Sequence, residues 1–422
     1  MKESQLRLLA TRRLLPLFTA QFLGALNDNL FKNALVILIT YRDTSNARTS
    51  EILVTIAGAI FIAPYFLFSA TAGQIADKFE KQHLVRVIKL WEIGVMILAT
   101  AGFAFHNIVY QMTVLFGLGI QATFFGPVKY AIIPELLDES ELMSGNALIE
   151  AGTFLAILIG TIAGGLLILA PHGGAIVSAA LLTMAGLGWI ASFFVPRARE
   201  GDTGLRINWN IATETWRILR HAFGSPRLRM PLLGISWFWF LGIAYLAQFP
   251  NYAKAVLGAN NEVVTLFLTL FSIGIGAGSM LAGRLQRGEV SLRMVPVGAT
   301  GLMLFGLDFW LGGRLFGSGD GLMGAAEFLS SPQHWRIVVD LVGIALSGGF
   351  YCVPLYVAMQ ARSEPDYRAR VIAANNIMNA LFMTVAGVLS AAMLAAGLGI
   401  TSIFLAIGIA NVAVTIASWR GR

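Results

Sequence analysis

GQIADKFEKQHLVR, residues 73–86, is a short charged segment between two long apolar stretches, residues 51–72 and 84–105. Each apolar stretch is long enough to cross the hydrocarbon core of a bilayer, about 30 Å, as a helix. Charged residues that interrupt apolar runs in this way are typical of the connections between membrane spans. The segment therefore predicts a chain that crosses a membrane more than once.

The composition of the whole chain also indicates a membrane protein. Its 422 residues are 56% hydrophobic and 13% charged, whereas soluble domains are about 25% charged. Apolar runs of about 20 residues recur to the C-terminus and leave no stretch for a sizeable water-soluble domain. We predict twelve spans, at residues 14–41, 51–72, 84–105, 108–131, 145–170, 174–195, 228–256, 262–283, 291–313, 336–360, 370–396 and 398–419.

Lysine and arginine residues are concentrated in the connections on one side of these spans. The positive-inside rule makes that side the cytoplasmic one, so we expect a multi-pass protein with both termini in the cytoplasm. The same bias accounts for the net charge of +7 without a nucleic-acid partner. The first apolar run is too long for the core of a signal peptide, and we expect it to be the first span.

The longest polar stretch, residues 196–227, separates two sets of six predicted spans, residues 1–195 and 228–422. It carries Trp209 and Trp216 among arginines, which predicts a short amphipathic helix on the cytoplasmic membrane surface. We expect an all-α membrane protein with an N-terminal six-helix half, a cytoplasmic linker and a C-terminal six-helix half.

The two halves also echo each other in sequence. Residues 119–150 resemble residues 348–376, with Pro127 and Pro354 in corresponding places. We expect Pro127 to end the fourth span. Weak parallel repeats of this kind occur in transporters whose halves rock about a central site.

The opening segment resembles the signature that the major facilitator superfamily carries between its second and third helices. In that family a glycine lets two helices approach closely, and an acid meets the end of a neighbouring helix. The resemblance implies these roles for Gly73 and Asp77, with Lys78, Lys81 and Arg86 as the basic groups. Such charges can form a conformational latch on the cytoplasmic side. An ordinary basic loop is the alternative.

Three further stretches resemble the lysophospholipid transporter family, particularly members fused to acyltransferase domains: AQFLGALNDNLFKNALVIL (20–38), FFGPVKYAIIPEL (124–136) and GNALIEAGTFLAILIGTIAGG (145–165). In that family, major facilitator proteins flip lysophospholipids across the bacterial inner membrane towards the cytoplasm, where an acyltransferase rebuilds the diacyl lipid. The resemblance implies a lysophospholipid substrate, such as lysophosphatidylethanolamine, and a location in the inner membrane.

The chain departs from that family in two ways. No histidine is followed at the fifth position by an aspartate, as an acyltransferase requires, so we expect a transporter and not an enzyme. Any acyltransferase is then a partner on another chain or a missing domain. The family often places an arginine in the seventh span, but residues 236–252 contain none.

Ionisable residues inside a span are costly and are functional candidates by default. In the first span Gln21, Asp28 and Lys32 share a helix face, and Asn27 and Asn29 flank the acid. Asp28 could bind a coupling Na⁺ or H⁺, or the amine of a headgroup, with amide oxygens beside it. The alternative is an Asp28–Lys32 ion pair that only holds helices together. We expect no other metal and no cofactor.

Lys129 and Glu150, in the fourth and fifth spans, form a second candidate set. Lys129 could attract a phosphate while Glu150 binds a cation, or the two could pair with each other. Amide side chains that could line a polar cavity or join helices are Asn146, Asn375, Asn376 and Asn379.

Other charged and aromatic residues are weaker candidates. We expect Lys89, Glu92, Asp308 and Asp340 to lie near a membrane interface or to pair with residues 73–86. Aromatic residues that could line an acyl pocket, or simply pack against neighbours, are Trp237, Trp239, Tyr245, Phe249 and Tyr252.

These observations predict two halves that rock about a cavity, with Asp28 and the Lys129–Glu150 set meeting the headgroup. A lysolipid has one tail, so the cavity should be partly apolar and open sideways to the membrane lipids. Two alternatives remain: an exporter of drugs or small metabolites with the same fold, and a non-transporting membrane anchor for an acyltransferase.

Overall fold

The computed structural model describes residues 5–41, 47–105, 107–286, 289–315 and 322–420, and within these ranges it contains no β-strand. Its α-helices are α1 (Leu15–Tyr41), α2 (Ala47–Lys78), α3 (Lys81–Phe105), α4 (Ile108–Leu136), α5 (Leu142–Leu169), α6 (Gly173–Ser192), α7 (Ile211–Gly224), α8 (Pro226–Ala255), α9 (Asn261–Leu285), α10 (Met294–Leu315), α11 (Ala325–Ser330), α12 (Trp335–Arg362), α13 (Arg368–Ala395) and α14 (Ile400–Arg420). Short 3₁₀ helices are η1 (Gln5–Ala10), η2 (Glu139–Glu141), η3 (Pro332–His334) and η4 (Pro365–Tyr367).

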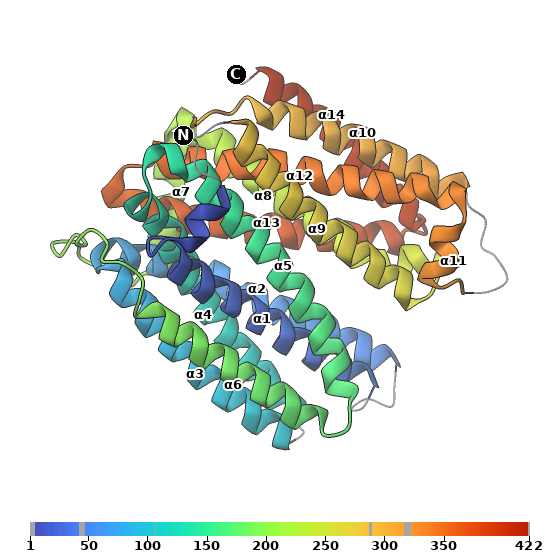
Figure 1. Cartoon of the computed structure of the whole chain (residues 1–422), viewed down its shortest axis with the longest axis horizontal. Coiled ribbons are helices and arrows are strands. Elements are labelled where there is room, and N and C mark those ends of the chain that lie inside the picture. Colours follow the sequence, from blue (N-terminus) through green and yellow to red (C-terminus); the bar gives the residue numbers. More distant parts are fainter. Residues whose placement is uncertain (1–4, 42–46, 106, 287–288, 316–321, 421–422) are drawn as a thin grey trace.

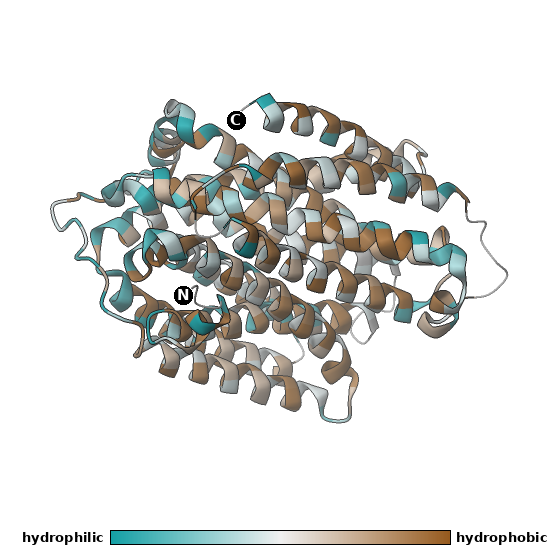
Figure 2. Ribbon diagram, turned by 45° about the horizontal axis from the view of Figure 1, so that its top comes forward, coloured by the Kyte–Doolittle hydropathy of each residue, from teal (hydrophilic) through white to brown (hydrophobic). Residues whose placement is uncertain are grey.

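Twelve helices of the described chain are long and apolar enough to cross a membrane, which confirms the predicted number of spans and the all-α fold. The other two, α7 and α11, are short. Figure 2 shows hydrophobic residues along the bundle and many of the hydrophilic ones towards its two ends. The chain is a multi-pass membrane protein.

The long helices lie in two groups (Figure 1). Helices α1 to α6 occupy the lower part of the view, and α8 to α14 the upper part. We call them the N-terminal group and the C-terminal group. Both ends of the chain and α7 lie at one end of the bundle, the terminal end, and α11 lies at the opposite end.

Helix α1 packs directly on α5, because glycines of α5 face its backbone. A Cβ added at Gly160 would lie 2.6 Å from the carbonyl oxygen of Leu26, and one at Gly164 would lie 2.5 Å from that of Leu30. Distances that short leave no room for a side chain, so the two backbones can approach closely. This contact fixes the orientation of the face of α1 that carries Asp28.

Two predicted boundaries are wrong. Pro127 does not end the fourth span, because α4 continues through it to Leu136. Membrane helices tolerate such prolines, since neighbouring helices and local adjustments satisfy the freed backbone groups. The second boundary is that of α2, which runs to Lys78, so the first residues of the segment 73–86 are helical.

The linker at residues 196–227 contains α7 and is fixed to the bundle. Ile218 of α7 is fully buried, whereas Trp216 is exposed, so the helix has one packed face and one free face. The backbone N–H of Asn208 donates to Gln74 Oε1 at 2.7 Å, and Gln74 Nε2 donates to the Asn208 carbonyl at 3.2 Å. These bonds hold the linker against α2.

Candidate functional site

A cavity of about 500 Å³ lies between the two groups. Along α1 its lining runs from Gln21 to Val36, a distance of about 22 Å at the rise of an α-helix. Its charged lining residues come from the N-terminal group and are Asp28, Lys32, Lys89 and Lys129. The C-terminal group contributes Trp239, Ile243, Tyr356, Asn376, Asn379 and Met383. This central cavity therefore has one charged wall and one neutral wall.

Asp28 lines the central cavity but forms no ion pair with Lys32 in the described part of the structure. Its Oδ1 atom is buried and has no hydrogen-bond partner among the described residues. Lys32 Nζ instead donates to Asn29 Oδ1 at 3.1 Å and lies 5.4 Å from the centre of the Phe61 ring. The geometry therefore does not support the alternative in which Asp28 and Lys32 neutralise each other as an ion pair.

Two other polar residues of α1, Gln21 and Asn27, face different ways. Gln21 lines the central cavity and accepts a hydrogen bond from the Thr153 hydroxyl at 3.0 Å. Asn27 is fully buried and donates to Glu92 Oε1 and to the Leu181 carbonyl, each at 3.2 Å. Adjacent residues of a helix point about 100° apart. Of the two amides that could supply an oxygen beside Asp28, Asn29 therefore lines the central cavity and Asn27 does not.

Lys89 and Glu92 are not isolated near an interface, which corrects another expectation. Both side chains are fully buried, and Lys89 Nζ lies 2.7 Å from Glu92 Oε2. Gln121 Nε2 also donates to Glu92 Oε2, at 3.1 Å, and Lys89 lies 4.9 Å from the Phe125 ring centre. This ion pair borders the central cavity through Lys89.

Lys129 and Glu150 do not hold each other at ion-pair distance in the described structure. Lys129 Nζ lies 4.3 Å from the centre of the Tyr130 ring and borders the central cavity. Glu150 accepts a short hydrogen bond from the Tyr130 hydroxyl through Oε1, while its Oε2 atom is buried without a partner among the described residues. Tyr130 therefore contacts both residues. Of the two, only Lys129 borders the central cavity.

The candidate amides divide between the cavity and the helix contacts. Asn379 borders the central cavity and accepts from the Ser236 hydroxyl at 2.9 Å. Asn375 is buried behind it and accepts from Asn379 Nδ2 at 3.3 Å. Asn146 lies away from the cavity lining and exchanges two hydrogen bonds of 2.8 Å with Gln360 of α12. This pair joins the two groups.

Asp77 meets α13, at the terminal end of the bundle. It accepts hydrogen bonds from the backbone N–H groups of Ala369 and Arg370, at 3.0 and 3.3 Å, and pairs with Arg370 Nε at 2.8 Å. A Cβ added at Gly73 would lie 2.7 Å from that of Ala373. The glycine therefore allows α2 and α13 to approach, and the acid caps the first turn of α13.

The basic groups expected to serve Asp77 have other partners. Lys81 pairs with Glu135 at 2.7 Å, largely buried. Arg86 donates to the Phe193 carbonyl at 3.2 Å and lies 5.2 Å from its ring centre. Lys78 makes a cation–π contact with the residue that follows it. The basic partner of Asp77 is Arg370 of the other group, which corrects the expected latch.

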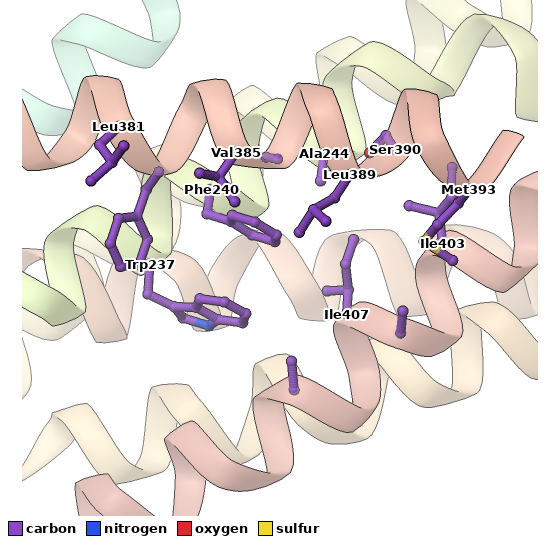
Figure 3. A pocket seen from close by; sticks show the side chains of 14 residues that line it. Trp237, Phe240, Ala244, Leu381, Val385, Leu389, Ser390, Met393, Ile403 and Ile407 are labelled. Carbon is purple, nitrogen blue, oxygen red and sulfur yellow. The ribbon is translucent and has the colours of Figure 1, made fainter. Parts of the chain in front are cut away.

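The aromatic residues of α8 separate into three environments. Trp239 borders the central cavity. Trp237 borders a second, nearly apolar groove of about 430 Å³ between α8, α13 and α14, seen in Figure 3 with Phe240 beside it. Tyr245, Phe249 and Tyr252 line neither space and pack in an aromatic cluster with residues such as Phe309 and Phe404. For these three the acyl-pocket expectation is wrong.

Asp308 and Asp340 do not pair with residues 73–86 in the described structure, and they differ from each other in exposure. Asp308 is partly exposed and bonds to Arg336. Asp340 is only 2% exposed, so it does not lie at an interface with its carboxylate in water. In the described chain, no group of three or more metal-ligating side chains could hold a metal ion.

Sequence reasoning missed several residues of this site. Tyr65 and Gln121 line the central cavity, and a polar side chain inside an apolar run was the available signal. Arg370 and Gln360 join the two groups at the terminal end, and each lies near the end of its helix. Their partners are distant in sequence, so no local pattern indicates the pairing.

Known proteins resemble this chain in sequence. The family model of the Major Facilitator Superfamily matches residues 17–326. The lysophospholipid transporter LplT of Escherichia coli O157:H7 (strain EC4115 / EHEC) is 28% identical over 393 residues, which are 89% of this chain and 87% of that protein. The LplT of Escherichia coli (strain K12) is 28% identical over 405 residues, 92% and 90% of the two proteins.

Solved structures resemble it in fold. The human organic anion transporter MFSD10 (TETRAN) has a TM-score of 0.76 at 13% identity and covers 96% of this chain and 99% of its own. The Escherichia coli fucose:proton symporter FucP has a TM-score of 0.67 at 13% identity and covers 97% and 98%. At such identity the likeness shows the fold alone. With a family model that matches most of its length and a fold shared with solved transporters, the chain belongs to the major facilitator superfamily of membrane transporters.

Proposed function

We propose that this chain transports lysophospholipids, such as lysophosphatidylethanolamine, and binds them in the central cavity. The observation that carries the proposal is that this one cavity has both charged and apolar lining residues. Its charged lining residues all belong to the N-terminal group, and much of the remaining lining is apolar or aromatic, including Phe61, Ile157, Trp239 and Met383. A lipid with one charged headgroup and one acyl chain needs both surfaces in one space. The similarity to LplT supports the same substrate class.

The headgroup has two complementary partners in this arrangement. Lys129 borders the cavity without a carboxylate at ion-pair distance in the described structure, so its ammonium can attract the phosphate. Asp28 has a buried oxygen without a partner among the described residues, so it can accept the ethanolamine ammonium or a coupling Na⁺ or H⁺. Lysolipid phosphate and amine thus meet opposite charges.

The direction and coupling belong to the same proposal. The terminal end faces the cytoplasm of a bacterial inner membrane, as the distribution of basic residues favours. With the terminal end closed, the cavity is shut off from the cytoplasm, and rocking of the two groups to open that end carries the lipid towards the cytoplasm. There an acyltransferase on another polypeptide can use it. A Na⁺ or H⁺ gradient drives the movement.

Uptake by purified protein in liposomes tests the proposal. Labelled lysophosphatidylethanolamine should enter the lumen-facing leaflet with saturable kinetics, faster than in protein-free liposomes, and diacyl phosphatidylethanolamine should not compete. Folded protein without saturable lysolipid uptake would overturn the proposal. Movement of a drug or dye in that case would favour an exporter, and absence of all transport with binding of an acyltransferase would favour an anchor.

A further inference from the structure

The wall of the central cavity that belongs to the C-terminal group carries an amide with unused donors. Asn376 of α13 lines the central cavity, and its Nδ2 atom is buried without a hydrogen-bond partner among the described residues. A side-chain amide nitrogen has two N–H donors, and a buried donor that finds no acceptor costs free energy. An acceptor that enters the central cavity therefore gains from contact with Asn376.

Two other asparagines on the same stretch of α13 have partners. Asn375 Nδ2 donates to the Leu232 carbonyl at 3.3 Å, and Asn379 Nδ2 donates to Asn375 Oδ1, also at 3.3 Å. Asn379 Oδ1 in turn accepts from the Ser236 hydroxyl at 2.9 Å. These bonds join α13 to α8 within the C-terminal group. Asn376 takes no part in them, so its Nδ2 atom is left for a ligand.

The unused amide lies against α4 of the N-terminal group. A Cβ added at Gly126 would lie 2.8 Å from Asn376 Nδ2, so the missing side chain at Gly126 is what lets the amide approach α4. Gly126 and Lys129 both line the central cavity. They are three residues apart on one helix, which places their Cβ positions about 5–6 Å from each other. Asn376 Nδ2 therefore lies within about 9 Å of the Lys129 Cβ.

The two side chains can reach an anion between them. The Lys129 ammonium ends a flexible four-carbon stem and has three donors. In the described structure its Nζ lies 4.3 Å from the centre of the Tyr130 ring, with no carboxylate at ion-pair distance. Rotation about the side-chain bonds of the half-buried Asn376 turns its N–H groups towards the cavity. A phosphate has several oxygens and accepts charge-assisted hydrogen bonds from an ammonium and an amide at the same time.

We propose that Asn376 donates from Nδ2 to the headgroup phosphate that Lys129 attracts, so that one phosphate is held by both groups of helices. The inference rests on the proposed function, because it assigns a second phosphate ligand for that substrate. The bound headgroup then joins α4 to α13. Rocking of the two groups separates Lys129 from Asn376, so the phosphate is bound most tightly while the terminal end is closed and is released as that end opens.

Equilibrium binding of labelled lysophosphatidylethanolamine to the purified full-length chain tests the assignment. Asn376→Leu keeps a branched side chain and removes both donors, so Kd should rise by about 12- to 160-fold, the equivalent of one hydrogen bond to a charged group. A monoacylglycerol, which lacks phosphate, should bind equally well to the unmodified chain and to Asn376→Leu. An unchanged Kd for the lysolipid, or an equal loss for both ligands, would overturn the assignment.

Asn376→Asp gives a second readout if Asn376→Leu does not fold. It keeps the shape of the side chain, but an ionised carboxylate only accepts hydrogen bonds. Lysophosphatidic acid, which has the phosphate and no amine, should therefore bind at least about 12-fold more weakly to Asn376→Asp, and equal binding would contradict the assignment. Asn107→Ala, at an exposed cap of α4, should leave every Kd unchanged.

The same assay separates this inference from the proposed function. If the unmodified chain shows no saturable lysolipid binding, the proposed function is wrong and the inference falls with it. If the unmodified chain binds saturably and Asn376→Leu binds equally well, only the assignment of Asn376 is wrong.

Discussion

Tyr130 of α4 and Tyr356 of α12 stack face to face, with ring centroids 4.6 Å apart and ring planes at 10°. Both line the central cavity and they come from the two groups, so the stack forms the floor of the cavity towards the terminal end. Nearer to that end, Asn146 and Gln360 exchange two hydrogen bonds, and Asp77 pairs with Arg370. These contacts together close one end of the central cavity.

Gln360→Leu should favour opening at the terminal end. The substitution removes both hydrogen bonds and leaves Oδ1 of the fully buried Asn146 without its donor, at a cost of about 1–3 kcal/mol to the closed state, while Asn146 Nδ2 keeps its bond to the Leu142 carbonyl. The buried Cys352, one turn from Tyr356 and the single cysteine of the chain, reports on this opening. Its labelling by a permeant maleimide should accelerate at least about 5-fold. Asn107→Ala, which removes an exposed cap of α4, should leave the rate unchanged.

Lys129→Gln should weaken recognition of the phosphate. A charged hydrogen bond is worth about 1.5–3 kcal/mol, so KM for lysophosphatidylethanolamine should rise by about 12- to 160-fold. Lys129→Arg keeps the charge and should retain most of the affinity. A monoacylglycerol, which lacks phosphate, should bind equally well to the unmodified chain and to Lys129→Gln. An equal loss for both ligands would assign Lys129 a structural role only.

Asp28→Asn should abolish coupled uptake while the protein folds normally. The substitution removes the charge at the unpartnered Oδ1 atom that borders the central cavity. Uptake driven by a Na⁺ or pH gradient should fall at least tenfold, and the remaining flux should no longer respond to the gradient. Uptake that stays gradient-driven in Asp28→Asn would remove Asp28 from the coupling mechanism.

The sequence was sufficient for the fold because a membrane span needs a contiguous apolar run, which is a local property. It was sufficient for locating Asp28, since a charge inside such a run is visible without a structure. It could not supply the partner of Asp77, because Arg370 lies 293 residues away and the pairing depends on how two groups of helices pack. That the Asn27 side chain points away from the face of Asp28 could have been derived from the sequence, since neighbours on a helix point about 100° apart.

Gly73→Ala should weaken the closed state by separating α2 from α13. The added methyl group would lie 2.7 Å from the Ala373 Cβ and 3.0 Å from the Arg370 Cα, so the helices must move apart. Overpacking of this kind costs about 1–3 kcal/mol. Thermal stability should fall and Cys352 labelling should accelerate. Gly94→Ala in α3 is the matched control, because nothing lies within 4 Å of the added Cβ, and it should change neither measurement.

Glu92→Gln should destabilise the chain more than loss of the whole Lys89–Glu92 pair. Both side chains are fully buried, so the single substitution leaves the ammonium of Lys89 without its counter-charge, at a cost of about 3–5 kcal/mol. Lys89→Met combined with Glu92→Gln removes both charges and should restore much of the melting temperature, since a buried pair is worth little against apolar replacements. If the double variant is less stable than Glu92→Gln, Lys89 must stabilise the fold by something other than neutralisation, and its contact with the Phe125 ring is the alternative.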